Sequence, residues 1–150
     1  MLTVGQPAPE FSLISHQGKS VSVADFRGHK VLLWFFPEAG SPSCTTEARS
    51  FRDQQEYFNE YNVIPLGVSF NSIEENAAFA AKEDLPFSLL CDTDRALSLA
   101  YGACDDPKAQ YPERVSVLID EQGRVARLYQ SVDPRDHAAR VLADLIDSQT

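Results

Sequence analysis

The sequence lacks an apolar stretch long enough to cross a membrane. Its longest apolar run, residues 31–36, ends at Pro37, whereas a membrane-spanning helix needs about 20 predominantly apolar residues. Residues 1–6 contain neither a positive region nor an apolar core, so we predict no secretory signal peptide. We therefore expect a soluble protein that has no membrane partner.

Positive charge is also scarce. The chain has 13 Lys and Arg residues against 22 Asp and Glu residues, which gives a formal net charge of −9 at pH 7. Because nucleic-acid binding favours a basic face, we expect no nucleic-acid partner. No repeat, low-complexity tract or linker interrupts the sequence, and 43% of its 150 residues are hydrophobic. These features predict one globular domain over residues 1–150.

The chain has only three cysteines, Cys44, Cys91 and Cys104. An odd number would leave one thiol over in a purely structural disulfide framework. Disulfides of cytosolic proteins are usually transient and belong to catalysis or redox sensing. We therefore expect a cytoplasmic protein in which any disulfide is transient.

Strand and helix patterns alternate along the chain. We predict strands at residues 10–14, 20–23, 31–36, 63–70, 87–90, 115–119 and 124–129, and helices at residues 44–58, 72–83, 93–101 and 133–148. Short Gly-containing loops join the first two and the last two strands into hairpins. Ser72 and Glu75 form a capping box, and Asp133 before Pro134 predicts the start of the last helix. This order indicates a three-layer α/β/α sandwich with a central mixed sheet and an N-terminal hairpin.

Cys44 follows the buried strand at residues 31–36 and a turn-forming loop, at the expected start of a helix. Ligands of open α/β sheets usually bind at the carboxyl ends of the strands. Unpaired backbone N–H groups and the helix dipole favour an anion at a helix start. A thiol there should ionise more easily than a free one, and the thiolate is the nucleophile. The position fits a reactive cysteine, although a buried structural cysteine fits it equally well.

The surrounding residues resemble a known family. Residues 36–48, FPEAGSPSCTTEA, are similar to the active-site signature of the peroxiredoxins, in which a proline, a threonine or serine and a cysteine stand at fixed spacing. Residues 5–11, 67–69, 89–92 and 114–120 also resemble segments of the subgroup called PrxQ or bacterioferritin comigratory protein (BCP). The resemblance extends over residues 4–129. It implies a thioredoxin-like fold of the AhpC/TSA type and a thiol-dependent peroxidase, an oxidoreductase of antioxidant function.

The resemblance also implies a role for each matching residue. Cys44 would attack the peroxide as a thiolate and become a sulfenic acid. Ser41 would hydrogen-bond the peroxide, and Arg114 would stabilise the thiolate and the developing charge on the leaving oxygen. Pro37 would cover the sulfur, and Glu47 would orient Arg114. The implied substrates are hydrogen peroxide and small organic hydroperoxides, and the implied reductant is thioredoxin or another thiol.

The sequence departs from the family pattern where many relatives carry a second, resolving cysteine. That position, five residues after Cys44, holds Arg49, and residues 72–83 contain no cysteine either. Cys104 lies in a polar loop before Arg114 and is the better resolving candidate, whereas the apolar context of Cys91 favours a buried structural role. A one-cysteine enzyme that is resolved by an external thiol is an equally good interpretation.

Two other function classes use the same cysteine. A non-enzymatic redox sensor or holdase would change its binding surface when Cys44 is oxidised. A thioredoxin-like disulfide oxidoreductase is less favoured, because the sequence from Ser41 to Cys44 has serine in place of the first cysteine of a C-x-x-C pair.

The remaining features indicate no cofactor. His16, His29 and His137 are far apart and fall in predicted loop or helix-surface contexts, without the spacing of metal ligands. We therefore predict no metal, flavin or nucleotide site. For the assembly we expect a monomer or a weak homodimer.

Overall fold

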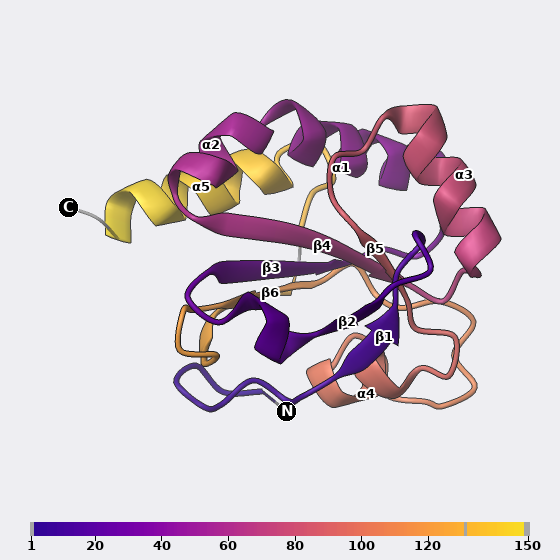
Figure 1. Cartoon of the computed structure of the whole chain (residues 1–150), viewed down its shortest axis with the longest axis horizontal. Helices are drawn as coiled ribbons and strands as arrows, with labels where there is room; N and C mark the ends of the chain where they lie inside the picture. The colour runs from indigo at the N-terminus through magenta and orange to yellow at the C-terminus, as the bar shows by residue number, and fades with distance from the viewer. Residues whose placement is uncertain (1, 131, 149–150) are drawn as a thin grey trace.

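A five-stranded mixed sheet forms the centre of the computed structural model, which describes residues 2–130 and 132–148 (Figure 1). Its strand order is β5-β4-β3-β6-β7. The strands are β3 (Lys30–Phe35), β4 (Val63–Ser69), β5 (Leu89–Cys91), β6 (Ser116–Ile119) and β7 (Val125–Tyr129). β3, β4 and β5 are parallel, whereas β6 runs antiparallel to β3 and β7 antiparallel to β6. The carboxyl end of β3 and the start of β6 therefore lie at the same edge of the sheet.

Helices cover both faces of this sheet. One face carries α1 (Pro42–Asp53), α2 (Gln55–Glu60), α3 (Ile73–Glu83) and α5 (His137–Ser148); the other carries α4 (Ala96–Tyr101), the hairpin of β1 (Ser12–Ile14) and β2 (Ser20–Ser22), and the 3-10 helix η1 (Val23–Phe26) (Figure 1). The expected three-layer α/β/α arrangement with a mixed sheet and an N-terminal hairpin is confirmed.

The side chains of β3 alternate between the two layers of core. Leu32, Trp34 and the following Phe36 point into the core beneath α1, α2, α3 and α5, and Val31 and Leu33 point into the core on the α4 side. Because successive side chains of a strand face opposite sides, a strand that is covered on both faces must be apolar throughout. The unbroken apolar run of the sequence is thus explained by its central place in the sheet.

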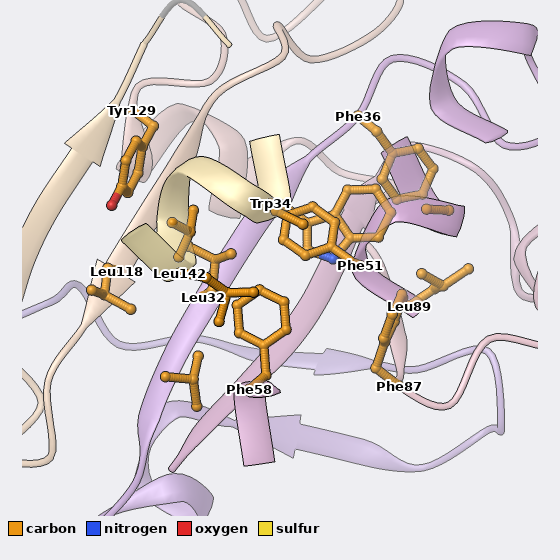
Figure 2. Close-up of a cluster of buried hydrophobic side chains, with 14 of the residues drawn as sticks. Leu32, Trp34, Phe36, Phe51, Phe58, Phe87, Leu89, Leu118, Tyr129 and Leu142 are labelled. Atoms are coloured by element: carbon orange, nitrogen blue, oxygen red, sulfur yellow. The ribbon is translucent and has the colours of Figure 1, made fainter. Parts of the chain in front are cut away.

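Aromatic rings fill the first of these cores (Figure 2). Trp34 stacks on Phe51 of α1 with ring centroids 5.1 Å apart. The ring of Phe36 also packs against Trp34, with centroids 4.8 Å apart. Phe58 of α2 extends the cluster beyond Phe51. Offset aromatic pairs of this kind fix α1 against the sheet, and α1 is the helix that carries Cys44.

Most predicted elements are present, although several boundaries differ by a few residues. The capping box of Ser72 and Glu75 starts α3, and both predicted hairpins form. The helix predicted over residues 44–58 begins two residues earlier, at Pro42, and divides at Gln54 into α1 and α2. The last helix begins at His137 rather than at Asp133, because the Asp133 carboxylate binds the backbone N–H and the guanidinium of Arg135 in a separate turn.

Within the described residues, each helix is too short or too polar to pass through a bilayer.

Gly67 occupies a place on β4 where no side chain fits. A Cβ atom there would lie 2.6 Å from Leu89 Cδ2 and 3.0 Å from ring atoms of Trp34 and Phe36. Both rings are fully buried and cannot withdraw. We expect Gly67→Ala to lower the free energy of unfolding by about 1–3 kcal/mol, the usual cost of overpacking, in urea denaturation.

A double variant separates this clash from a general effect on the strand. In Gly67→Ala/Leu89→Ala the nearest methyl group is absent, so the loss of stability should be smaller than the sum of the two single losses. Strict additivity would contradict a steric origin.

Candidate active site

The candidate site lies at the edge of the sheet where β3 ends and β6 begins. The backbone N–H of Phe35 donates to the carbonyl of Val115 at 2.8 Å, which sets Arg114 beside the segment that leads from β3 to α1. This is the carboxyl edge of the parallel strands, where ligands of open α/β sheets usually bind. The sheet register therefore brings together residues 44 and 114, which are 70 positions apart.

Cys44 is the third residue of α1 and is completely buried. Ser41 is the N-cap, and its hydroxyl oxygen accepts from the backbone N–H of Cys44 at 3.3 Å. Pro42 follows at the first helical position, where its missing N–H costs nothing. The first-turn N–H groups and the helix dipole therefore favour negative charge at the sulfur, as the sequence predicts.

An asparagine that sequence reasoning missed fixes the loop before α1. The backbone N–H of Ala39 donates to Oδ1 of Asn71 at 2.9 Å. Asn71 lies two residues after the end of β4. Gly40 has a φ of 83°, a conformation that suits glycine, and half-buried Pro37 begins the loop directly after the strand region. Asn71 was recognisable as a polar residue at the end of a neighbouring parallel strand, but nothing in the sequence shows its target.

Arg114 contacts both Cys44 and Glu47. Its Nη2 lies 3.5 Å from Cys44 Sγ, and its Nη1 donates to Glu47 Oε1 at 2.6 Å. Burial by itself lowers the pKa of Arg114, but the Glu47 carboxylate and the Cys44 sulfur outweigh this effect and raise the pKa above its ordinary value. The guanidinium is thus a fixed positive charge beside the sulfur. The contact between Arg114 and Glu47 is the one that the family resemblance implies.

His137 is a member of this cluster that the sequence analysis placed wrongly. It was expected on a surface, yet its side chain is fully buried, and its Nδ1 lies 2.8 Å from Glu47 Oε2. The reason is the face of α5 on which it stands: His137, Val141 and Leu145 are spaced by four and all point into the core. That spacing was the signal that could have revealed it.

The other two cysteines, like Cys44, have free thiols. Cys91 ends β5 and is buried, where it accepts from Asn76 Nδ2 at 3.3 Å. Burial raises the pKa of the Cys91 thiol, although the Asn76 hydrogen bond opposes this. The burial agrees with the structural role that its apolar context indicates.

Cys104 is half-buried on the loop after α4 and lines a cavity of about 580 Å³ with Tyr101, Glu113 and Ser116 among its walls. The Glu113 N–H donates to the carbonyl of Ala103 at 2.7 Å and ties this loop to the segment that holds Arg114. Ala103, however, is buried in the core on the α4 side of the sheet, whereas Cys44 belongs to the core on the opposite side.

Arg49, which stands where many relatives have a resolving cysteine, forms a salt bridge instead. Its Nε lies 2.6 Å from Glu83 Oε1 at the end of α3, and Arg52 Nη1 donates to the Glu83 carbonyl at 2.8 Å. The Arg49 guanidinium lowers the pKa of the Glu83 carboxyl. These contacts clamp α1 to α3.

The family model that matches the chain is that of the AhpC/TSA family, over residues 4–128. Peroxiredoxin Bcp of Bacillus subtilis is 36% identical, over 97% of this chain and 96% of the relative. The chain belongs to the AhpC/TSA family. It is a peroxiredoxin of the Bcp/PrxQ kind, a thiol-dependent peroxidase, and the predicted fold and family are confirmed.

Other proteins to which the chain is similar carry names of the same family. The chloroplastic peroxiredoxin Q of Sedum lineare is 33% identical, over 94% of this chain and 76% of the relative. The solved structure of peroxidoxin BcpB from Mycobacterium tuberculosis has a TM-score of 0.91 at 25% identity and covers both chains fully. The bacterioferritin comigratory protein of Xanthomonas campestris, which has alkyl peroxide reduction activity, has a TM-score of 0.89 at 25% identity, over 99% of this chain and 100% of that one.

The environment of Cys104 predicts a slow thiol at neutral pH. Burial and then the carboxylates of Asp92 and Asp105 raise its pKa, against an opposing backbone hydrogen bond at Asp106. Because the thiolate is the reactive form, Asp105→Asn should shift the alkylation of Cys104 by iodoacetamide to lower pH. Peptide mass spectrometry of samples alkylated from neutral to alkaline pH measures this shift. Glu56→Gln, on the distant α2, is the control, and an equal shift in that variant would contradict the explanation.

Proposed function

We propose that this peroxiredoxin reduces hydrogen peroxide and small organic hydroperoxides at Cys44. The observation that carries the proposal is the 3.5 Å contact between Arg114 Nη2 and the buried Cys44 Sγ at the start of α1. A thiolate that is flanked by a helix N-terminus and a guanidinium is a nucleophile with its counter-charge in place.

The first step transfers one oxygen atom to sulfur. The Cys44 thiolate attacks one oxygen of ROOH, the O–O bond breaks, and the products are the sulfenic acid Cys44–SOH and RO⁻, which takes up a proton and leaves as ROH. Arg114 faces the charge that moves from sulfur to the leaving oxygen. Ser41, whose oxygen already accepts from the Cys44 N–H, has its hydroxyl hydrogen left to donate to the peroxide. Pro37 would shield the sulfur from water.

The second step restores the thiol. A thiol R′SH condenses with Cys44–SOH to give the disulfide Cys44–S–S–R′ and water, and a further thiol then reduces the disulfide. Cys44 and the loop of Cys104 belong to opposite faces of the sheet, and a disulfide requires Cα atoms within about 7 Å. We therefore propose that a thiol of another molecule, most simply thioredoxin, resolves the sulfenic acid.

Substitution of the two central residues tests the first step. Cys44→Ser should abolish turnover of hydrogen peroxide with a thiol reductant. Arg114→Ala should slow the peroxide step roughly a hundredfold or more, which corresponds to about 3 kcal/mol of lost transition-state stabilisation. Stopped-flow kinetics measures both effects, with Cys91→Ser as an active control. Near-normal peroxidase activity in Cys44→Ser would rule out the assignment.

The mass of the oxidised protein tests the second step. After one equivalent of hydrogen peroxide is added to the reduced protein, we expect a gain of one oxygen at Cys44 that persists until a thiol is added, because the loop of Cys104 packs into the core on the opposite face of the sheet. The measurement is intact mass under non-reducing conditions. A loss of two hydrogens that disappears only in Cys104→Ser would show instead that Cys104 resolves the sulfenic acid.

A further inference from the structure

The buried Glu47 carboxylate is held by both of its oxygens. Oε1 accepts from Arg114 Nη1 at 2.6 Å, and Oε2 lies 2.8 Å from His137 Nδ1. The side chains of Glu47 and His137 are both completely buried. A continuous series of contacts therefore leads from the Cys44 sulfur through Arg114 and Glu47 to a histidine on α5.

The surroundings of His137 fix the ring nitrogen that carries the proton. A carboxylate only accepts hydrogen bonds, so Nδ1 donates. Nε2 is buried and has no hydrogen-bond partner among the described residues. The ring meets Phe51 edge-on at 5.2 Å and lies 5.9 Å from the ring of Tyr129. An N–H at Nε2 would be buried without an acceptor, which is costly, whereas an N–H at Nδ1 has the Glu47 carboxylate as its acceptor.

The other polar groups around the ring are engaged with one another. Charged or titratable residues near the ring include Glu47 on α1, Tyr129 on β7, Asp136 directly before α5, and Arg140 and Asp144 on α5. The Tyr129 hydroxyl donates to Asp144 Oδ2 at 2.7 Å. Burial and that hydrogen bond raise the pKa of Tyr129, so its phenol stays neutral. Arg140 lies 5.9 Å from the centroid of the Tyr129 ring. Glu47 is thus the acceptor for the histidine proton.

We propose that His137 is a positioning residue for the reaction of Cys44, an inference that rests on the function proposed above. Its Nδ1–H holds Oε2 of Glu47, which keeps Oε1 directed at Nη1 of Arg114 while Nη2 faces the sulfur. Without this hydrogen bond the carboxylate is fixed at one oxygen only, so it can turn and draw the guanidinium away from the sulfur. His137 therefore supports the thiolate through two intervening side chains.

Two substitutions of His137 separate the hydrogen bond from the ring. In His137→Asn the side-chain amide nitrogen takes about the place of Nδ1 and still donates, whereas His137→Leu fills the space without a donor. The parent for both is Cys91→Ser/Cys104→Ser, in which Cys44 is the only thiol. Alkylation of Cys44 by iodoacetamide as a function of pH and the rate of its oxidation by hydrogen peroxide are measured for each protein.

We expect His137→Leu to move the alkylation midpoint to higher pH and to slow oxidation on the order of tenfold, the lower end of what loss of an orienting partner costs. His137→Asn should keep most of the parent rate and midpoint. Val141→Ala, on the same buried face of α5, should lower the melting temperature and leave the midpoint in place. This control matters because a merely structural role of His137 would change stability alone.

Three results would overturn the inference. One is a folded His137→Leu protein with the parent midpoint and rate, and another is an equal shift in Val141→Ala. The third is that hydrogen peroxide fails to oxidise Cys44 in the parent protein. That result would overturn the proposed function together with the inference, and the parent protein alone reveals it, without any His137 variant.

Discussion

The carboxylate of Glu47 is the constraint on which the site depends. It is fully buried, and a buried charge is tolerated only where it is paired and its remaining lone pairs are satisfied. Arg114 supplies the opposite charge at 2.6 Å, and His137 supplies the second donor at 2.8 Å. The segment that leads into β6 and the start of α5 must therefore both contact α1 in the folded protein. Removal of either donor leaves part of a buried charge unsatisfied.

Contacts of the α1 helix itself also fix the position of Cys44, in addition to Arg114. α1 is fixed at its start by the Ser41 cap and by the loop that Asn71 holds, and along its length by the stacking of Phe51 on Trp34. The sulfur thus has a fixed place relative to the guanidinium. In a buried site a contact between a guanidinium and a sulfur, here 3.5 Å long, is screened little by water and salt.

The parts of this structure that could be predicted from the sequence are those with local causes. The capping box at Ser72, the hairpins and the apolar central strand follow from neighbouring residues, and the helix start that carries Cys44 does as well. The pairing of Glu47 with His137 joins residues 90 positions apart and has no local signature beyond the buried face of α5. Asn71 was missed for the same reason, since only the parallel pairing of β3 and β4 brings it to the loop.

The contacts between α1 and α3 matter differently for the oxidation of Cys44 by peroxide and for its reduction by a thiol. A small peroxide needs only a path to the sulfur, but a protein thiol must touch the sulfur itself, and Cys44 has 0% exposure in the folded form. The first turn of α1 must therefore open before a protein reductant can form a disulfide with Cys44. The Arg49–Glu83 salt bridge and the hydrogen bond from Arg52 to the Glu83 carbonyl tie the later part of α1 to α3, whereas the residues ahead of Arg49 lack these two contacts. A cysteine at position 49 would lie within this held part, whereas a thiol from outside needs only the first turn to move. The salt bridge at this position therefore fits an enzyme in which the folded α1 reacts with the peroxide. The reducing thiol then belongs to another molecule.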